Sequence, residues 1–193
     1  MKKYEEERYK FVDLKENIYP WVKNELVDHH ALNGKHFSEK DAPVIGFIGD
    51  LKIVFAIKRG EQYEILKDNM IAPGTDIVEL YHKACENLAR DIEYVMGNTW
   101  YGAFGIIADG VHEPSALCLK HIWNVCVEKL QDDLVIMTPS KDTIIFAQAS
   151  NKQLVDKLIE HGKQVYEAEL EKISDQVFFF SKDRKELSLY EYN

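Results

Sequence analysis

The 193-residue chain contains no apolar run close to the ~20 residues that a membrane-spanning helix needs. Its first eight residues are polar and lack the apolar segment of a secretory signal peptide. We therefore expect no membrane contact and a cytoplasmic location. The three cysteines would be reduced there, and none belongs to a C-x-x-C pair. Each lies in an apolar helical pattern, so Cys85, Cys118 and Cys126 are expected to be buried small side chains.

Nucleotide-binding signatures are also missing. Gly97, Gly102 and Gly105 form neither G-x-G-x-x-G nor G-x-x-x-x-G-K. Their spacing within an apolar run favours close backbone packing or a bulge in a buried strand. We therefore expect no bound cofactor.

Metal-binding patterns are equally weak. His29, His30 and His36 share one loop, but no cysteine lies near them and no H-E-x-x-H occurs, so a zinc site is not indicated. Asp50-Leu51-Lys52 matches half of a nuclease pattern, but such triplets are common by chance. We predict no metal.

Basic residues are outnumbered, 24 to 33, which gives a formal net charge of −9. The electrostatic field of this negative charge repels phosphate backbones and disfavours nonspecific binding of nucleic acid. An acidic surface would suit a basic partner without identifying one. The hydrophobic content of 46% is sufficient for a packed core without a metal or disulfide.

The first half of the chain contains one ambiguous segment and two clear ones. Apolar positions 11, 14, 18 and 22 have helical spacing, although Pro20 conflicts with a continuous helix. The apolar run 44–48 and the alternation over 51–58 predict strands, with a hairpin turn at 59–62. Asp76 is the expected N-cap of a helix that ends at Gly97-Asn98. Its apolar face comprises Ile77, Leu80, Tyr81, Ala84, Cys85, Leu88 and Ile92.

The second half alternates strands and helices, and the whole chain reads approximately ββ-α-β-α-ββ-α-ββ. We predict a single α+β domain over residues 1–193, with 1–10 as an N-terminal extension. Its sheet is mainly antiparallel and built from hairpins, and three main helices pack on one face. The predicted strands of this half are 100–108, 133–138, 143–148, 176–181 and 186–190. One predicted helix begins at 115 and another spans 152–169. Residues 139–142 are a predicted turn.

The most unusual segment runs from Tyr101 to Ser115, where a buried strand opens into a polar turn before a helix. His112 and Glu113 near Asp109 are a candidate acid/base site, since free N–H groups at a helix start also favour anions. The alternative is structural, because Pro114 suits the first helical position and Glu113 or Ser115 would then cap.

Three further positions are candidate binding residues. Tyr101 lies in the same segment, and Ser140 and Asp142 lie in the predicted turn at 139–142. No histidine lies close to Ser140 in sequence, so the turn interpretation is the simpler one there.

Several sequence blocks resemble the YtpQ-like family of bacterial proteins, whose activity is not established. The blocks are Asn17-Ile18-Tyr19-Pro20, Gly49-Asp50-Leu51, Ala84-Cys85-Glu86-Asn87-Leu88, Asp133-Leu134-Val135-Ile136, Pro139-Ser140-Lys141-Asp142-Thr143 and Ile173-Ser174-Asp175-Gln176-Val177-Phe178. The resemblance covers most of residues 15–190 and implies an α+β fold and a bacterial or phage origin. It supplies no catalytic residues.

From these observations we expect a non-catalytic protein that binds a macromolecule. The expected partner is a protein that the sequence does not identify, and the expected role is in regulation or in phage–host conflict. The alternative is a hydrolase that uses His112 and Glu113. An aromatic-rich face would favour the binding protein, and a pocket holding the two side chains would favour the enzyme. The oligomeric state is left open.

Overall fold

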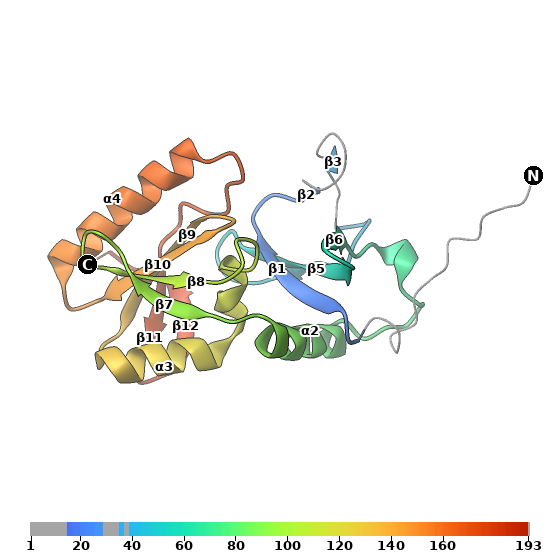
Figure 1. Cartoon of the computed structure of the whole chain (residues 1–193), viewed down its shortest axis with the longest axis horizontal. Helices are drawn as coiled ribbons and strands as arrows, with labels where there is room; N and C mark the ends of the chain where they lie inside the picture. Colours follow the sequence, from blue (N-terminus) through green and yellow to red (C-terminus); the bar gives the residue numbers. More distant parts are fainter. Residues whose placement is uncertain (1–14, 29–34, 37–38, 193) are drawn as a thin grey trace, which may run out of the picture. The chain divides into compact units, whose positions relative to one another are not determined.

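A computed structural model of the chain describes residues 15–28, 35–36 and 39–192 (Figure 1). Its contacts divide these residues into two compact units. The first contains the described residues up to 21, 25–45 and 53–91, and the second contains 22–24, 46–52 and 92–192. The α+β class is confirmed, with antiparallel pairing of strands. The single domain expected from the sequence remains a prediction, because compact units can still unfold together.

The sheet of the first unit has the strand order β1-β5-β4, and β6 pairs with β5. Positive φ at Gly60 closes the β5–β6 hairpin, as the turn at 59–62 predicted. The 44–48 strand is much shorter than expected. The elements are β1 (Ile18–Lys23), β2 (Val27–Asp28), β3 (Lys35–His36), β4 (Ile45–Gly46), β5 (Lys52–Arg59), β6 (Gln62–Ile65) and a 3-10 turn, η1 (Asp68–Met70).

Strand β1 replaces the helical pattern of residues 11–22, of which 11–14 lie outside the described residues. Pro20 lacks an N–H and disfavours helical geometry at Tyr19, so the apolar residues around it form an extended segment. Ile18 to Val22 are all buried. The helical spacing of the apolar positions therefore gave a wrong prediction, since a strand that is apolar throughout lacks the alternation by which strands are recognised.

Helix α2 (Ile77–Asp91) begins where the sequence predicted. Asp76 Oδ1 accepts the backbone N–H of Val78 at 2.8 Å, and that of Glu79 at 3.4 Å. The predicted end at Gly97-Asn98 is wrong, because the helix stops at Asp91 and a strand follows. The buried residues of the helix are Leu80, Ala84, Asn87 and Leu88.

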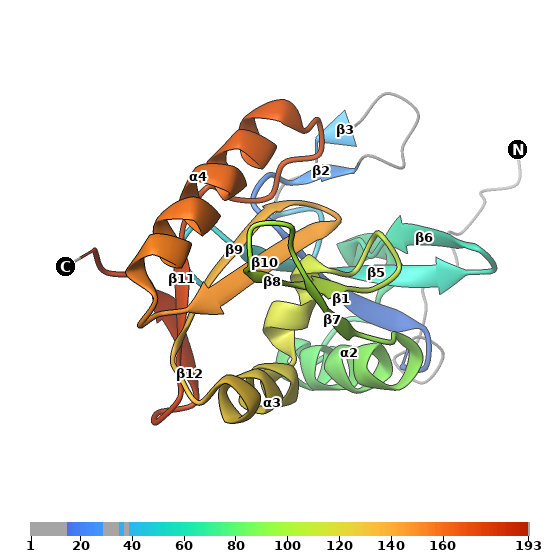
Figure 2. The ribbon, with the colours of Figure 1, turned by 60° about the vertical axis from the view of Figure 1, so that its left-hand side comes forward.

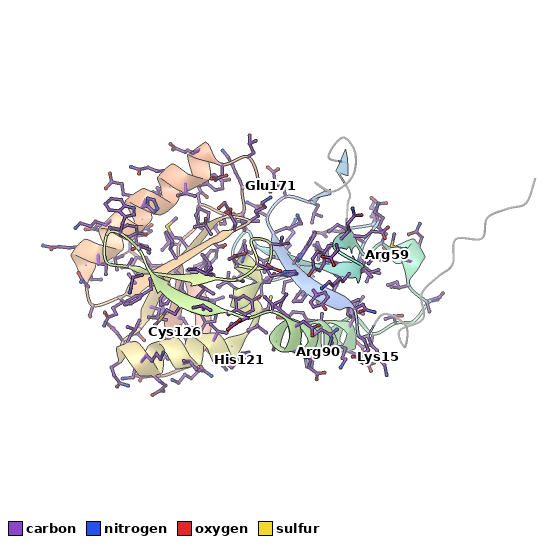
Figure 3. The ribbon with its side chains drawn as sticks, viewed as in Figure 1. Lys15, Arg59, Arg90, His121, Cys126 and Glu171 are labelled. Atoms are coloured by element: carbon purple, nitrogen blue, oxygen red, sulfur yellow. The ribbon has the colours of Figure 1, made fainter. Side chains whose placement is uncertain are left out.

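Polar contacts fix α2 against the start of β1. Asn87 Nδ2 donates to the carbonyl oxygens of Lys15 at 2.7 Å and Ile18 at 3.0 Å. Arg90, labelled with Lys15 in Figure 3, forms an ion pair with Glu16 at 2.8 Å. The Nδ2 group of the buried Asn87 thus pairs with two backbone carbonyl groups at the entry to β1.

The second unit contains a fully antiparallel sheet in the order β12-β11-β9-β10-β8-β7. Two of its hairpins, the one at 134–148 and the one at 178–189, were predicted from the sequence. The strands are β7 (Val95–Asn98), β8 (Phe104–Ile107), β9 (Leu134–Ser140), β10 (Thr143–Gln148), β11 (Phe178–Ser181) and β12 (Glu186–Leu189).

The two helices of this unit cover opposite faces of the sheet (Figure 2). Helix α4 (Lys152–Ala168) packs on Val135 and Met137 of β9. Helix α3 (Lys120–Leu130) places Trp123 against Phe146, 5.5 Å between ring centroids, on the other face. The prediction of helices on one face is therefore wrong. Every residue of β9 is buried, as expected for a strand covered on both sides.

The start of the second predicted helix also differs. A 3-10 turn, η2 (Pro114–Cys118), precedes α3, so regular α-helix begins at Lys120 rather than near Ser115. Trp123, Cys126 and Val127 are the buried residues of α3. Cys126, labelled in Figure 3, matches the expected buried cysteine, whereas Cys85 and Cys118 are partly exposed.

The predicted strand 100–108 is instead the turn and second strand of a hairpin. Thr99 N–H donates to the Ala103 carbonyl at 2.8 Å, and Gly102 has φ +94°. Gly97 and Gly105 lie opposite each other in the β7–β8 pair, where a Cβ at Gly97 would lie 3.0 Å from Ile107. Gly97 and Gly105 therefore serve close packing, as expected, whereas Gly102 lies in the turn of a hairpin rather than in a buried strand.

The turn predicted at 139–142 is shorter in the structure. Strand β9 continues through Pro139 and Ser140, and only Lys141 and Asp142 join it to β10. The Pro139 carbonyl accepts the Ile173 N–H at 3.0 Å. A register shift between Thr143 and Ile145 accommodates the proline, which has no N–H to donate to a ladder.

Candidate functional site

The predicted acid/base residues lie together in the loop between β8 and η2. His112 Nδ1 lies 2.8 Å from Asp109 Oδ2, and Asp109 Oδ1 accepts the backbone N–H of His112 at 2.9 Å. The His112 side chain is completely buried, while 37% of the Asp109 side chain is exposed. The loop thus presents the carboxylate to solvent and hides the imidazole.

Glu113 is turned back onto the preceding loop. Its Oε1 accepts the N–H groups of Ala108 at 3.0 Å and Gly110 at 2.9 Å. Its other oxygen, Oε2, is buried and has no hydrogen-bond partner among the residues that the structure describes. Glu113 precedes the first residue of η2, but its side chain does not cap that helix. The expected cap is therefore a loop-closing contact, with Pro114 at the helix start as predicted.

The charge of Asp109 is stabilised by its surroundings. Burial raises its pKa, but the hydrogen bond and charge of His112, together with backbone N–H donors, outweigh burial and lower the pKa to about 2. An Asp–His pair of this kind orients an imidazole. Because that imidazole is buried, the arrangement suits loop structure better than proton transfer to a substrate.

Ser140 and Asp142 form a local hydrogen bond at the tip of the β9–β10 hairpin. Ser140 Oγ donates to Asp142 Oδ1 at 2.9 Å, and Thr143 Oγ1 donates to the same oxygen at 3.2 Å. Ser140 is 1% exposed. These contacts give both residues a role in the turn.

Tyr101 lines a different site, together with residues that the sequence did not indicate. Trp100, which is 85% exposed, lies beside Tyr101 at the tip of the β7–β8 hairpin. Their ring centroids are 5.3 Å apart, and His161 of α4 lies 5.0 Å from Tyr101 and 6.2 Å from Trp100. We call the opening of about 560 Å³ beside these rings the aromatic pocket; it is lined by Trp100, Tyr101, Lys157, Glu160, His161 and Gln164.

The aromatic pocket is amphipathic. Burial raises the pKa of the Tyr101 phenol, and the nearby Thr99 hydroxyl opposes this by a smaller amount. Lys157 and Glu160 bring opposite charges to the rim from one face of α4. The pocket thus combines large rings with two opposite charges and the Gln164 amide.

A third cluster joins sequence blocks that lie far apart in the chain. Asp50 Oδ1 accepts the Ser174 hydroxyl at 2.7 Å, and Asp50 Oδ2 accepts the Asn24 amide at 2.7 Å. Burial raises the pKa of Asp50, and its hydrogen bonds oppose this. Gly49 has φ +55°, and a Cβ there would collide with the Gln176 side chain. With both carboxylate oxygens occupied, this cluster ties a loop to the C-terminal segment.

The histidine loop singled out in the sequence lies mostly outside the described residues. His29 and His30 lie outside the described residues, and His36 lies in β3, with nothing described of its side chain. Among residues 15–28, 35–36 and 39–192, no group of three His, Cys, Asp or Glu could hold a metal ion. Within the same ranges, no helix is long and apolar enough to cross a bilayer.

Comparisons with protein-family models, with curated proteins and with solved structures found no match to the chain.

Proposed function

We propose that this is a non-catalytic protein that binds a partner protein through the aromatic pocket. One observation carries the proposal: an almost fully exposed tryptophan stands at a hairpin tip, supported by two other rings. Water contact with so large an apolar side chain is unfavourable, and its burial against a partner would be favourable.

The support of Trp100 by neighbouring rings strengthens this argument. Edge-to-face contacts with Tyr101 and His161 restrict the indole before any partner arrives. A side chain that is already ordered loses less conformational entropy on binding, so more of its contact energy contributes to affinity. Tryptophan and tyrosine are also the residue types most enriched among binding hot spots.

The net charge of −9 favours a partner with a basic surface and disfavours nonspecific binding of nucleic acid. The resemblance to the YtpQ-like family is part of this proposal, as are a cytoplasmic location and a role in regulation or phage–host conflict. The alternative function, hydrolysis at His112 and Glu113, is disfavoured because His112 is buried and Glu113 Oε1 is occupied by backbone N–H groups.

The test is affinity capture from the native host with wild type, Trp100→Ala and Leu170→Ala. Leu170 is 95% exposed and does not line the pocket, so its variant is a matched control. Neither exposed position should change stability by more than a few tenths of a kcal/mol. We expect a protein captured by wild type and by the Leu170 variant, and lost with Trp100→Ala.

The hydrolase alternative is tested by His112→Gln in whichever assay reveals the protein's action. A folded His112→Gln variant that retains the action, while Trp100→Ala loses it, supports binding. Loss of several orders of magnitude in a stably folded His112→Gln variant, with Trp100→Ala unaffected, would reject the proposal in favour of catalysis.

A further inference from the structure

The β7 strand forms one edge of the six-stranded sheet, with β8 on its inner side. An edge strand presents N–H and C=O groups that can pair with another strand. At the opposite edge, Leu189 of β12 lies against the segment around Gly49. Among the described residues no further strand pairs with β7.

The hydrogen-bond pattern of the hairpin fixes which groups of β7 face outward. Thr99 N–H donates to the Ala103 carbonyl, so Thr99 and Ala103 are a hydrogen-bonded pair. In an antiparallel ladder such pairs alternate with non-hydrogen-bonded pairs. Met96 and Asn98, opposite Ile106 and Phe104, therefore direct their N–H and C=O groups away from β8.

This pattern is self-complementary about Gly97. If a second β7 approaches antiparallel with a two-fold axis at Gly97, Met96 of each copy faces Asn98 of the other, and both pairs use outward-facing groups. The two Gly97 residues then form the non-hydrogen-bonded pair at the centre, where Cα atoms approach to about 4.5 Å. Glycine brings no Cβ to that closest approach.

Charge and apolar surface agree with this arrangement. Val95 to Asn98 carry no charge, so two copies of the strand meet without the repulsion that like charges cause across a ladder. Val95 and its cross-strand partner Ile107 are 51% and 58% exposed, an apolar pair next to the edge.

We propose that β7 is a homodimer interface, in which two copies of this chain pair their β7 strands antiparallel about Gly97 and join their sheets. Because the paired strands are short, the dimer should be in a concentration-dependent equilibrium with the monomer. This inference does not rest on the proposed function.

The test is sedimentation equilibrium of wild type, Met96→Lys/Asn98→Lys and Glu186→Lys. The double variant places lysines opposite each other in both reciprocal pairs, and Glu186→Lys makes the same change in net charge at the other edge. We expect wild type and Glu186→Lys to dimerise alike, and the double variant to raise the dimer dissociation constant at least about tenfold. Thermal melts should show all three folded.

A second experiment tests the proposed register, in which Met96 of each copy faces Asn98 of the other. Met96→Glu/Asn98→Glu should also be monomeric, and an equimolar mixture with the lysine variant should form heterodimers, because each lysine then faces a glutamate. A wild type that stays monomeric up to about 1 mM would overturn the proposal. A dimer that the lysine variant leaves unchanged, or a mixture that does not associate, would do so as well.

Discussion

Asp109, one of the candidate acid/base residues, has a pKa that the fold shifts clearly. Its pKa is lowered to about 2, from an ordinary value near 3.8, by His112 and by backbone N–H groups. A carboxyl group with a lowered folded-state pKa stabilises the folded protein above its unfolded-state pKa. That contribution is lost as the pH falls through the folded-state value.

We therefore predict a pH-dependent effect of Asp109→Asn. The amide still offers an oxygen to the N–H groups of Val111 and His112 but lacks the charge. The variant should be less stable than wild type above about pH 4, and the difference should shrink as the pH falls toward about 2. Urea unfolding across this range measures it. A difference that is constant with pH would show that the charge of Asp109 contributes nothing.

The candidate acid/base residues that the structure brings together are close in the chain. Asp109, His112 and Glu113 fall within five positions, so a single turn brings them together. Trp100 and His161 lie on different elements, and their contact depends on how the hairpin tip packs on α4. No local pattern encodes that contact. The only local signal for Trp100 was its position before Gly102, typical of a hairpin turn.

Among the elements, α2 offers the clearest test of local reasoning. Asp76 accepts the N–H groups of Val78 and Glu79 as an N-cap should. Asp76→Ala should destabilise the protein by about 1 kcal/mol, while Asp76→Asn, which keeps an acceptor, should be nearly neutral. Chemical denaturation of the two variants measures this. If alanine and asparagine cost the same, capping is not what Asp76 contributes.

The elements that the sequence missed share a physical cause. Strand β1 is buried from Ile18 to Val22, and β7 is a four-residue strand that begins at Val95, shortly after α2 ends at Asp91. Neither shows the alternation that marks a half-exposed strand, so pairing with distant strands decides their conformation. Helix α4 and the β11–β12 hairpin were predicted nearly to their ends, because caps, turns and periodicity are all local there.

At the scale of the whole molecule, the two compact units raise the question of cooperativity. The single domain predicted from the sequence implies one thermal transition, with equal calorimetric and van't Hoff enthalpies. Differential scanning calorimetry measures both quantities. Two resolved transitions would show that the units unfold independently and that the chain has two domains.

The thiols and histidines give a second prediction for the whole molecule. Burial raises the pKa of Cys126 to about 11, with a smaller opposing effect of Lys129, so its thiol is protonated at neutral pH. We expect the melting temperature to be unchanged by chelator and by reductant, and elemental analysis to find no stoichiometric zinc. A fall of several degrees with either reagent would reveal a metal in the histidine loop or a disulfide.

The central claim is that Trp100 anchors a protein partner. Its most direct test is isothermal titration of that partner into wild type, Trp100→Ala and Leu170→Ala. An anchoring tryptophan contributes at least about 2 kcal/mol, so Trp100→Ala should raise the dissociation constant about 30-fold or more, whereas Leu170→Ala should match wild type. A dissociation constant for Trp100→Ala within twofold of wild type, in a folded variant, would contradict the account.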